Sequence, residues 1–177
     1  MNLYEAESFY KQYLGNTFRM AHEDESTYRI FKELCRDDDI LKQWDAGLIE
    51  ESLENMNPSC ENSWKHLECI FHIISRGKCS IQTYAERILG KLAEMAECDG
   101  EVLVKIIEIM TGRDCMLEEG GIRLFLKDTD LQDEMMEVMD LLVESAEEKC
   151  GNDDVTLQRS EEHYLTALRL YRKKYRK

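Results

Sequence analysis

The sequence has few residues that interrupt helices and little of the pattern typical of strands. Its 177 residues include one proline, Pro58, and nine glycines. β-branched residues rarely alternate with polar ones. Apolar residues recur instead at the three- and four-residue spacing of amphipathic helices. The exceptions are the polar connection AHEDES and the irregular stretch TGRDCMLEEGGIRLFLKD. The sequence therefore predicts an all-α fold with seven to nine helices in antiparallel pairs, arranged as an irregular HEAT/ARM-like stack or a globular helical bundle.

The sequence also lacks export and membrane signals. No apolar run approaches the roughly 20 residues that a membrane-spanning helix needs. The N-terminal stretch MNLYEAESFYKQYLG has neither the basic nor the apolar region of a signal peptide. The seven cysteines are scattered, with no C-x-x-C pair, as expected for reduced thiols in a cytoplasmic protein. We expect one domain over residues 1–177 and no membrane association.

Motifs of catalysis and metal binding are missing as well. The sequence contains no G-x-S-x-G, no phosphate-binding glycine loop and no H-E-x-x-H. Cys60, His66, Cys69, His72 and Cys79 fall in one window, but their spacing does not pair ligands as a zinc site does. The acidic clusters lack the glycine and glutamate spacing of a calcium-binding EF-hand loop. The sequence thus predicts a protein that is not an enzyme, with no cofactor and no metal.

Negative charge is abundant and unevenly distributed. The net charge is −14, and the basic C-terminal helical tail RLYRKKYRK (169–177) carries six cations, which leaves −20 on the rest of the chain. An acidic body repels nucleic acid and accelerates association with basic proteins. Tyrosines between the cations of the tail suit stacking on bases, but cations at a helix C-terminus also complement the helix dipole. Nucleic acid is therefore an unlikely partner, and a basic protein is the expected one.

Acidic side chains form clusters on several expected helices, including those at 133–137 and 144–148. The run Asp37–Asp39 lies between two apolar-periodic stretches, where one aspartate suffices to cap the following helix. The surplus of carboxylates is what a surface for a basic partner needs. The residues predicted to bind the partner are Asp37, Asp38, Asp39, Glu50, Glu51, Glu54, Glu118 and Glu119.

The stretch from Tyr28 to Met56 resembles a pattern in small helical proteins encoded beside bacterial polymorphic toxins. In that pattern Y-x-x-F-x-x-L precedes a break and a helix bearing W-x-x-x-L-I. The matching residues, in about 29 of 177 positions, are Tyr28, Phe31, Leu34, Trp44, Leu48 and Ile49. The resemblance implies an immunity protein of a contact-dependent growth inhibition system, cytosolic and acidic, which inhibits a toxin domain by occluding it. A helical scaffold or adaptor that links cellular proteins is the alternative.

Overall fold

The computed structural model describes residues 1–112, 120–151 and 154–175, and in these ranges all regular structure is helical. The predicted all-α class is confirmed. Ten α-helices and one short 3-10 helix are present, against the seven to nine helices predicted. They are α1 (Leu3–Gln12), α2 (Thr17–Glu23), α3 (Glu25–Leu34), α4 (Asp38–Asn55), α5 (Ser63–Ser75), α6 (Ile81–Glu94), η1 (Met95–Glu97), α7 (Gly100–Thr111), α8 (Gly121–Asp128), α9 (Gln132–Cys150) and α10 (Val155–Tyr175).

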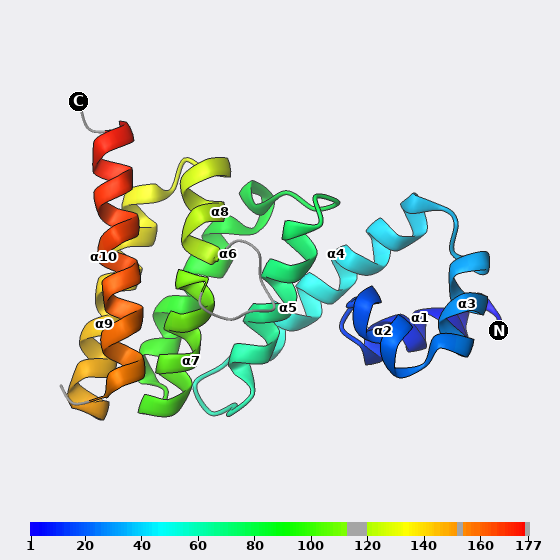
Figure 1. Cartoon of the computed structure of the whole chain (residues 1–177), viewed down its shortest axis with the longest axis horizontal. Coiled ribbons are helices and arrows are strands. Elements are labelled where there is room, and N and C mark those ends of the chain that lie inside the picture. Colours follow the sequence, from blue (N-terminus) through cyan, green and yellow to red (C-terminus); the bar gives the residue numbers. More distant parts are fainter. Residues whose placement is uncertain (113–119, 152–153, 176–177) are drawn as a thin grey trace.

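The molecule is elongated (Figure 1). Helices α1–α3, which we call the N-terminal unit, lie at one end, and α9 and α10 lie at the other. Helix α4 leads from the N-terminal unit and packs along α5. Helices α5–α10, which we call the helical array, form the rest of the molecule, with α9 and α10 at the end opposite the N-terminal unit. Helix α7 lies at the centre of the array because it contacts α5, α8, α9 and α10.

The N-terminal unit is built around aromatic rings. Its first helix begins with a capping box, in which Asn2 accepts a hydrogen bond from the Glu5 amide at 2.9 Å. Tyr10 stacks on Phe31 with ring centroids 5.7 Å apart, and Trp44 of α4 lies 5.8 Å from Tyr10. Trp44 is half-buried and packs against the hydrophobic core beside these rings.

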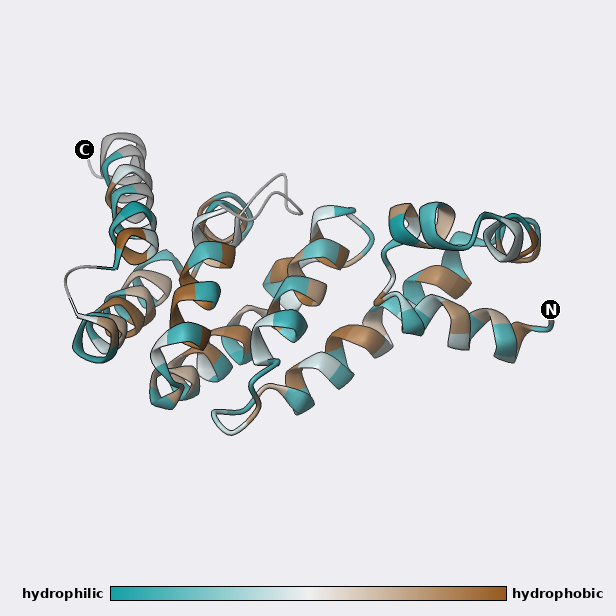
Figure 2. Cartoon of the chain, turned by 60° about the horizontal axis from the view of Figure 1, so that its bottom comes forward, coloured by the Kyte–Doolittle hydropathy of each residue, from teal (hydrophilic) through white to brown (hydrophobic). Residues whose placement is uncertain are grey.

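The helical array has an aliphatic core. Asp99 caps α7 by accepting a hydrogen bond from the Val102 amide at 3.1 Å, and Gly112 ends the helix in the left-handed conformation. The hydrophobic colour of Figure 2 lies mainly on helix faces that meet one another. No described helix is long and apolar enough to span a bilayer. Fully buried side chains of the array include Leu67, Ile70, Ile88, Leu92, Leu103, Ile106, Ile107, Met139 and Leu142.

Two helices account for the excess over the prediction. Helix α2 overlaps the predicted connection AHEDES and buries only Met20, so it shows no apolar stripe. Helix α8 lies in the stretch predicted to be irregular, where two glycines suggested a turn. Gly121 has a packing role instead, because a Cβ there would lie 2.6 Å from Met110 Sδ and 2.7 Å from the Phe71 ring.

Candidate partner-binding surfaces

The three aspartates at the start of α4 serve mainly to begin that helix. The Asp37 side chain accepts a hydrogen bond from the Asp39 amide at 2.9 Å, and Asp38 and Asp39 lie in the positive first turn. Asp38 also forms an ion pair with Lys78 at 3.1 Å. The predicted capping role is therefore confirmed. The predicted role in binding a partner stays a prediction, and two of the three carboxylates already have interactions within the chain.

The other predicted carboxylates on α4 lie at its far end. Asp38 and Glu50 are separated by about 18 Å along the helix axis, from the usual helical rise. Glu50 is paired with Arg87 of α6 at 2.7 Å, whereas Glu51 and Glu54 are exposed. Glu118 and Glu119 lie outside the described residues. The structure thus does not bring the predicted α4 carboxylates together into one surface.

A denser acidic surface runs along α9. Its carboxylates recur every three or four residues, opposite the buried residues Met135, Met139 and Leu142. They extend over about 22 Å of helix. Leu141, 41% exposed, flanks them. We call this surface the acidic stripe, and its seven exposed carboxylates belong to Asp133, Glu134, Glu137, Asp140, Glu144, Glu147 and Glu148.

Three carboxylates of the stripe have no ion pair to a described cation, whereas Asp38 and Glu50 of α4 each have one. Among the described residues, no cation lies within ion-pair distance of Glu137, Glu144 or Glu148. Lys149, at the end of α9, is occupied because it donates to the backbone carbonyls of Ala96 and Cys98. The acidic clusters of α9 are visible in the sequence, but nothing there favours them over the α4 carboxylates as a binding surface. The preference for α9 depends on long-range ion pairs such as Arg87–Glu50, which sequence spacing does not reveal.

A buried polar cluster joins the N-terminal unit to α4 and α5. The fully buried carboxylate of Asp45 accepts hydrogen bonds from the Tyr10 hydroxyl at 2.5 Å and from Arg76 Nη2 at 2.8 Å. Arg76 also donates through Nη1 to the backbone carbonyl of Gly15. Within the described chain, Asp45 Oδ2 and Arg76 Nε are buried without a hydrogen-bond partner. The cluster connects three distant segments, but it does so with incomplete hydrogen bonding.

Burial dominates the electrostatics of this cluster. It raises the pKa of the Asp45 carboxyl above its usual value, although the Tyr10 hydroxyl and Arg76 oppose that change. Burial likewise raises the pKa of the Tyr10 hydroxyl, against the effect of Arg76 and with support from Asp45. Tyr10 therefore remains a protonated donor at neutral pH. The geometry suits a structural contact between segments, because the Tyr10 hydroxyl and the Asp45 carboxylate are buried and already hydrogen-bonded to each other.

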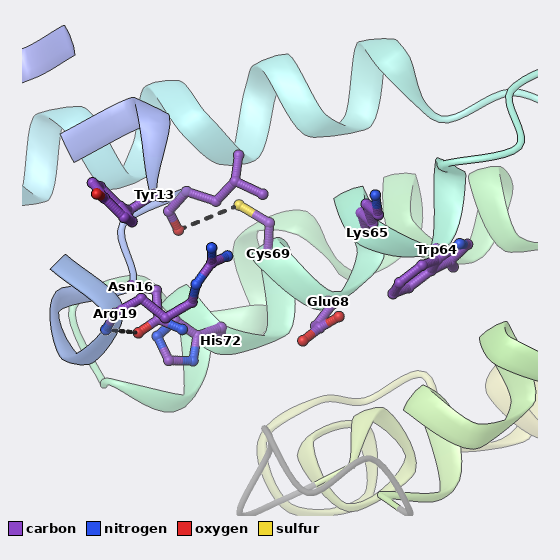
Figure 3. A pocket seen from close by; sticks show the side chains of 9 residues that line it. Tyr13, Asn16, Arg19, Trp64, Lys65, Glu68, Cys69 and His72 are labelled. Carbon is purple, nitrogen blue, oxygen red and sulfur yellow. Dashed lines mark hydrogen bonds between the residues drawn. The ribbon is translucent and has the colours of Figure 1, made fainter. Parts of the chain in front are cut away.

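A groove lies between the corner of α1 and α2 and one face of α5 (Figure 3). It encloses a volume of about 180 Å³. From α5 it is lined by residues three or four positions apart, which share one helix face. Asn16 lies at its edge, where the Asn16 side chain caps α2 by accepting from the Arg19 amide at 3.0 Å. The lining residues are Tyr13, Leu14, Asn16, Arg19, Trp64, Lys65, Glu68, Cys69 and His72.

The cysteine and histidine of this groove come from the window tested for zinc ligands. Burial raises the pKa of the Cys69 thiol to about 11, and the thiol faces the Leu14 carbonyl at 3.8 Å. Burial, with a contribution from Arg76, lowers the pKa of His72. At neutral pH the groove therefore holds a protonated thiol and a neutral imidazole. In the described part of the chain, no group of three or more histidine, cysteine or acidic side chains is placed to hold a metal ion.

Known proteins provide no further guide, because no family model, no curated protein and no solved structure matches the chain. The functional assignment therefore depends on the surfaces described above.

Proposed function

We propose that this chain is a non-catalytic, cytoplasmic protein-binding domain that binds a basic partner through the acidic stripe of α9. The observation that carries the proposal is the continuity of the stripe. Seven exposed carboxylates share one face of one helix over about 22 Å. Such a surface increases the encounter rate with a basic protein and disfavours acidic partners.

The composition of the stripe supports a protein as the partner. Leu141, beside the carboxylates, offers apolar surface that a binding partner would cover. The carboxylates of Glu137, Glu144 and Glu148 have no ion pair to a described cation, so binding a basic surface would not break an existing pair. The α4 carboxylates Asp38 and Glu50 would have to give up Lys78 and Arg87. This difference favours α9 over α4.

An immunity protein is the class that these features fit best. The resemblance of residues 28–56 to immunity proteins encoded beside bacterial toxins points the same way. In this interpretation the carboxylates of α9 take the place of substrate phosphates on a basic, nuclease-type toxin domain and occlude its active site. The proposed architecture is an irregular HEAT-like stack, in which α4–α10 present successive outer helix faces and α9 supplies the binding face.

The test is binding between this chain and the product of the neighbouring gene, with two charge-reversal variants. The first replaces Glu137, Glu144 and Glu148 with lysine on α9. The second replaces the same number of exposed carboxylates on α4, namely Asp39, Glu51 and Glu54, and so has the same net charge. We expect the α9 variant to bind at least about tenfold more weakly than the α4 variant. The two variants have the same net charge, so a difference in affinity must come from the surface that is changed.

Toxicity of the neighbouring gene product distinguishes the immunity function from the scaffold alternative. An immunity protein protects cells that express the neighbour, and the α9 variant protects them less than the α4 variant does. A complex with a harmless neighbour supports a scaffold or adaptor and contradicts the immunity function. Equal binding by both variants contradicts the assignment of the site to α9.

A further inference from the structure

The groove between the α1–α2 corner and α5 concentrates cations on an otherwise acidic protein. Arg19 lies on one side and Lys65 on the other. Lys65 Nζ and Lys105 Nζ lie 5.4 and 4.6 Å from the centroid of the Trp64 ring. Glu68 is the one carboxylate in the described lining, and Glu23 pairs with Arg19 beside it. Arg19, Lys65 and Lys105 thus exceed these carboxylates by one, which in a chain with a net charge of −14 marks a site for a negative ligand.

The guanidinium of Arg19 is positioned to bind a carboxylate. Its ion pair with Glu23, 2.8 Å long, uses Nε. The terminal nitrogens make no hydrogen bond to a described residue, and Figure 3 shows the side chain extending from α2 towards Cys69 on α5. Two parallel N–H groups of an arginine match the two oxygens of a carboxylate. The half-buried imidazole of His72 also lines the groove and is a neutral hydrogen-bonding group at neutral pH.

The rest of the groove offers apolar surface. Leu14 and the Trp64 ring are half-buried, so each keeps part of its surface open to solvent. A volume of about 180 Å³ suits one or two side chains rather than a large cofactor. The groove therefore combines a guanidinium that can bind a carboxylate with apolar surface from Leu14 and the Trp64 ring.

We propose that this groove binds an acidic, leucine-containing segment of a partner protein, with a carboxylate on Arg19 and an apolar side chain against Trp64. The groove lies away from α9, and its preference for charge is opposite to that of the acidic stripe. The inference thus goes beyond the proposed function and does not depend on it. It gives the chain a second interaction surface, which a basic partner on α9 leaves open.

The probe is a short blocked peptide of alternating leucine and glutamate, titrated into the full chain. The readout is the indole N–H resonance of Trp64, with that of Trp44 in the aromatic cluster as the internal reference. We expect a saturable shift of the Trp64 signal and no change at Trp44. A peptide with glutamine in place of glutamate, and one with lysine in its place, should leave the Trp64 signal unshifted.

Two arginine variants test whether Arg19 binds the carboxylates of the peptide. Arg19→Met should raise the dissociation constant about tenfold, the usual effect of losing a charge-assisted pair. Arg123→Met removes an exposed arginine of α8 and is the matched control, expected to bind like wild type. Melting temperatures of both variants show that each is folded. The proposal is overturned by an absent or unsaturable shift, by an equal shift with the glutamine peptide, or by equal affinities of the two arginine variants.

Discussion

The N-terminal unit and the helical array are held together by different chemistry. The unit packs aromatic rings and is joined to α4 and α5 through a buried ion pair, in which Asp45 is fully buried and Arg76 is partly exposed. The array packs aliphatic side chains around α7, and its described ion pairs lie at the surface. Aliphatic packing tolerates small changes of shape, whereas a buried charge needs its particular partner. Single substitutions should therefore damage the N-terminal junction more than the array.

Loss of the Arg76 guanidinium, the partner of the buried Asp45, should have the largest effect. Arg76→Met leaves Asp45 buried without a counter-charge, and we expect the free energy of unfolding to fall by about 3–5 kcal/mol. The control is Arg87→Met, which breaks the exposed pair with Glu50 and should cost no more than about 1 kcal/mol. Urea denaturation measures both.

The pH dependence sharpens this prediction. The pKa of Asp45 is already raised by burial, and without Arg76 it rises further. A raised carboxyl pKa in the folded state means that stability is lost as pH increases. The deficit of Arg76→Met should thus shrink on acidification, when Asp45 takes up a proton. If Arg76→Met and Arg87→Met lowered the free energy of unfolding equally at neutral pH, the N-terminal junction would not be more sensitive to substitution than the array.

Two glycines with similar positive φ angles provide the next comparison. Gly15 and Gly77 have φ values of +69° and +79°. A Cβ at Gly15 would lie 2.9 Å from Arg76 Nη2 and 3.1 Å from the Tyr10 hydroxyl, whereas a Cβ at Gly77 meets nothing within 4 Å. Gly77→Ala should cost about 1–2 kcal/mol for the backbone alone, and Gly15→Ala about 2–4 kcal/mol because Asp45 holds Arg76 in place. Thermal unfolding with equal losses would show that the polar cluster can shift freely.

The smallest effect is expected from a carboxyl pair at the edge of the array. Burial, a hydrogen bond to Glu147 and the charge of Glu147 raise the pKa of Glu161 to about 7 from its usual 4.5. Folding then favours the protonated form, so this contribution to stability is lost as pH rises from about 4.5 to 7. Glu161→Gln should stabilise the chain at pH 8 by less than about 1 kcal/mol and leave it unchanged at pH 5. A gain that is equal at both pH values would contradict the shifted pKa.

The fold was predictable to the extent that each helix carried its own signal. Capping by Asp37 depends only on the residues that follow it directly, so the sequence revealed it. Helix α2 escaped prediction because only Met20 is buried. The packing role of Gly121 could not be predicted from the sequence, because its close contact with Phe71 is not local.

The surfaces were less predictable because they depend on distant pairs. Tyr10 and Arg76 lie 35 and 31 residues from Asp45, and no spacing rule connects them. The same holds for Glu50 and Arg87, 37 residues apart, whose pairing makes the α4 surface less acidic than its sequence suggests. The regular carboxylate spacing of α9 was visible in the sequence. The absence of an ion pair from Glu137, Glu144 and Glu148 to any described cation was not.

The most direct test of the proposed function is the rate constant of association with the basic neighbour, measured at several salt concentrations. We expect a rate constant that falls steeply as salt increases for the wild type and for the α4 variant. We expect a slower and nearly salt-independent rate constant for the α9 variant with Glu137, Glu144 and Glu148 replaced by lysine. The same rate constant and the same salt dependence for all three proteins would contradict binding through the acidic stripe.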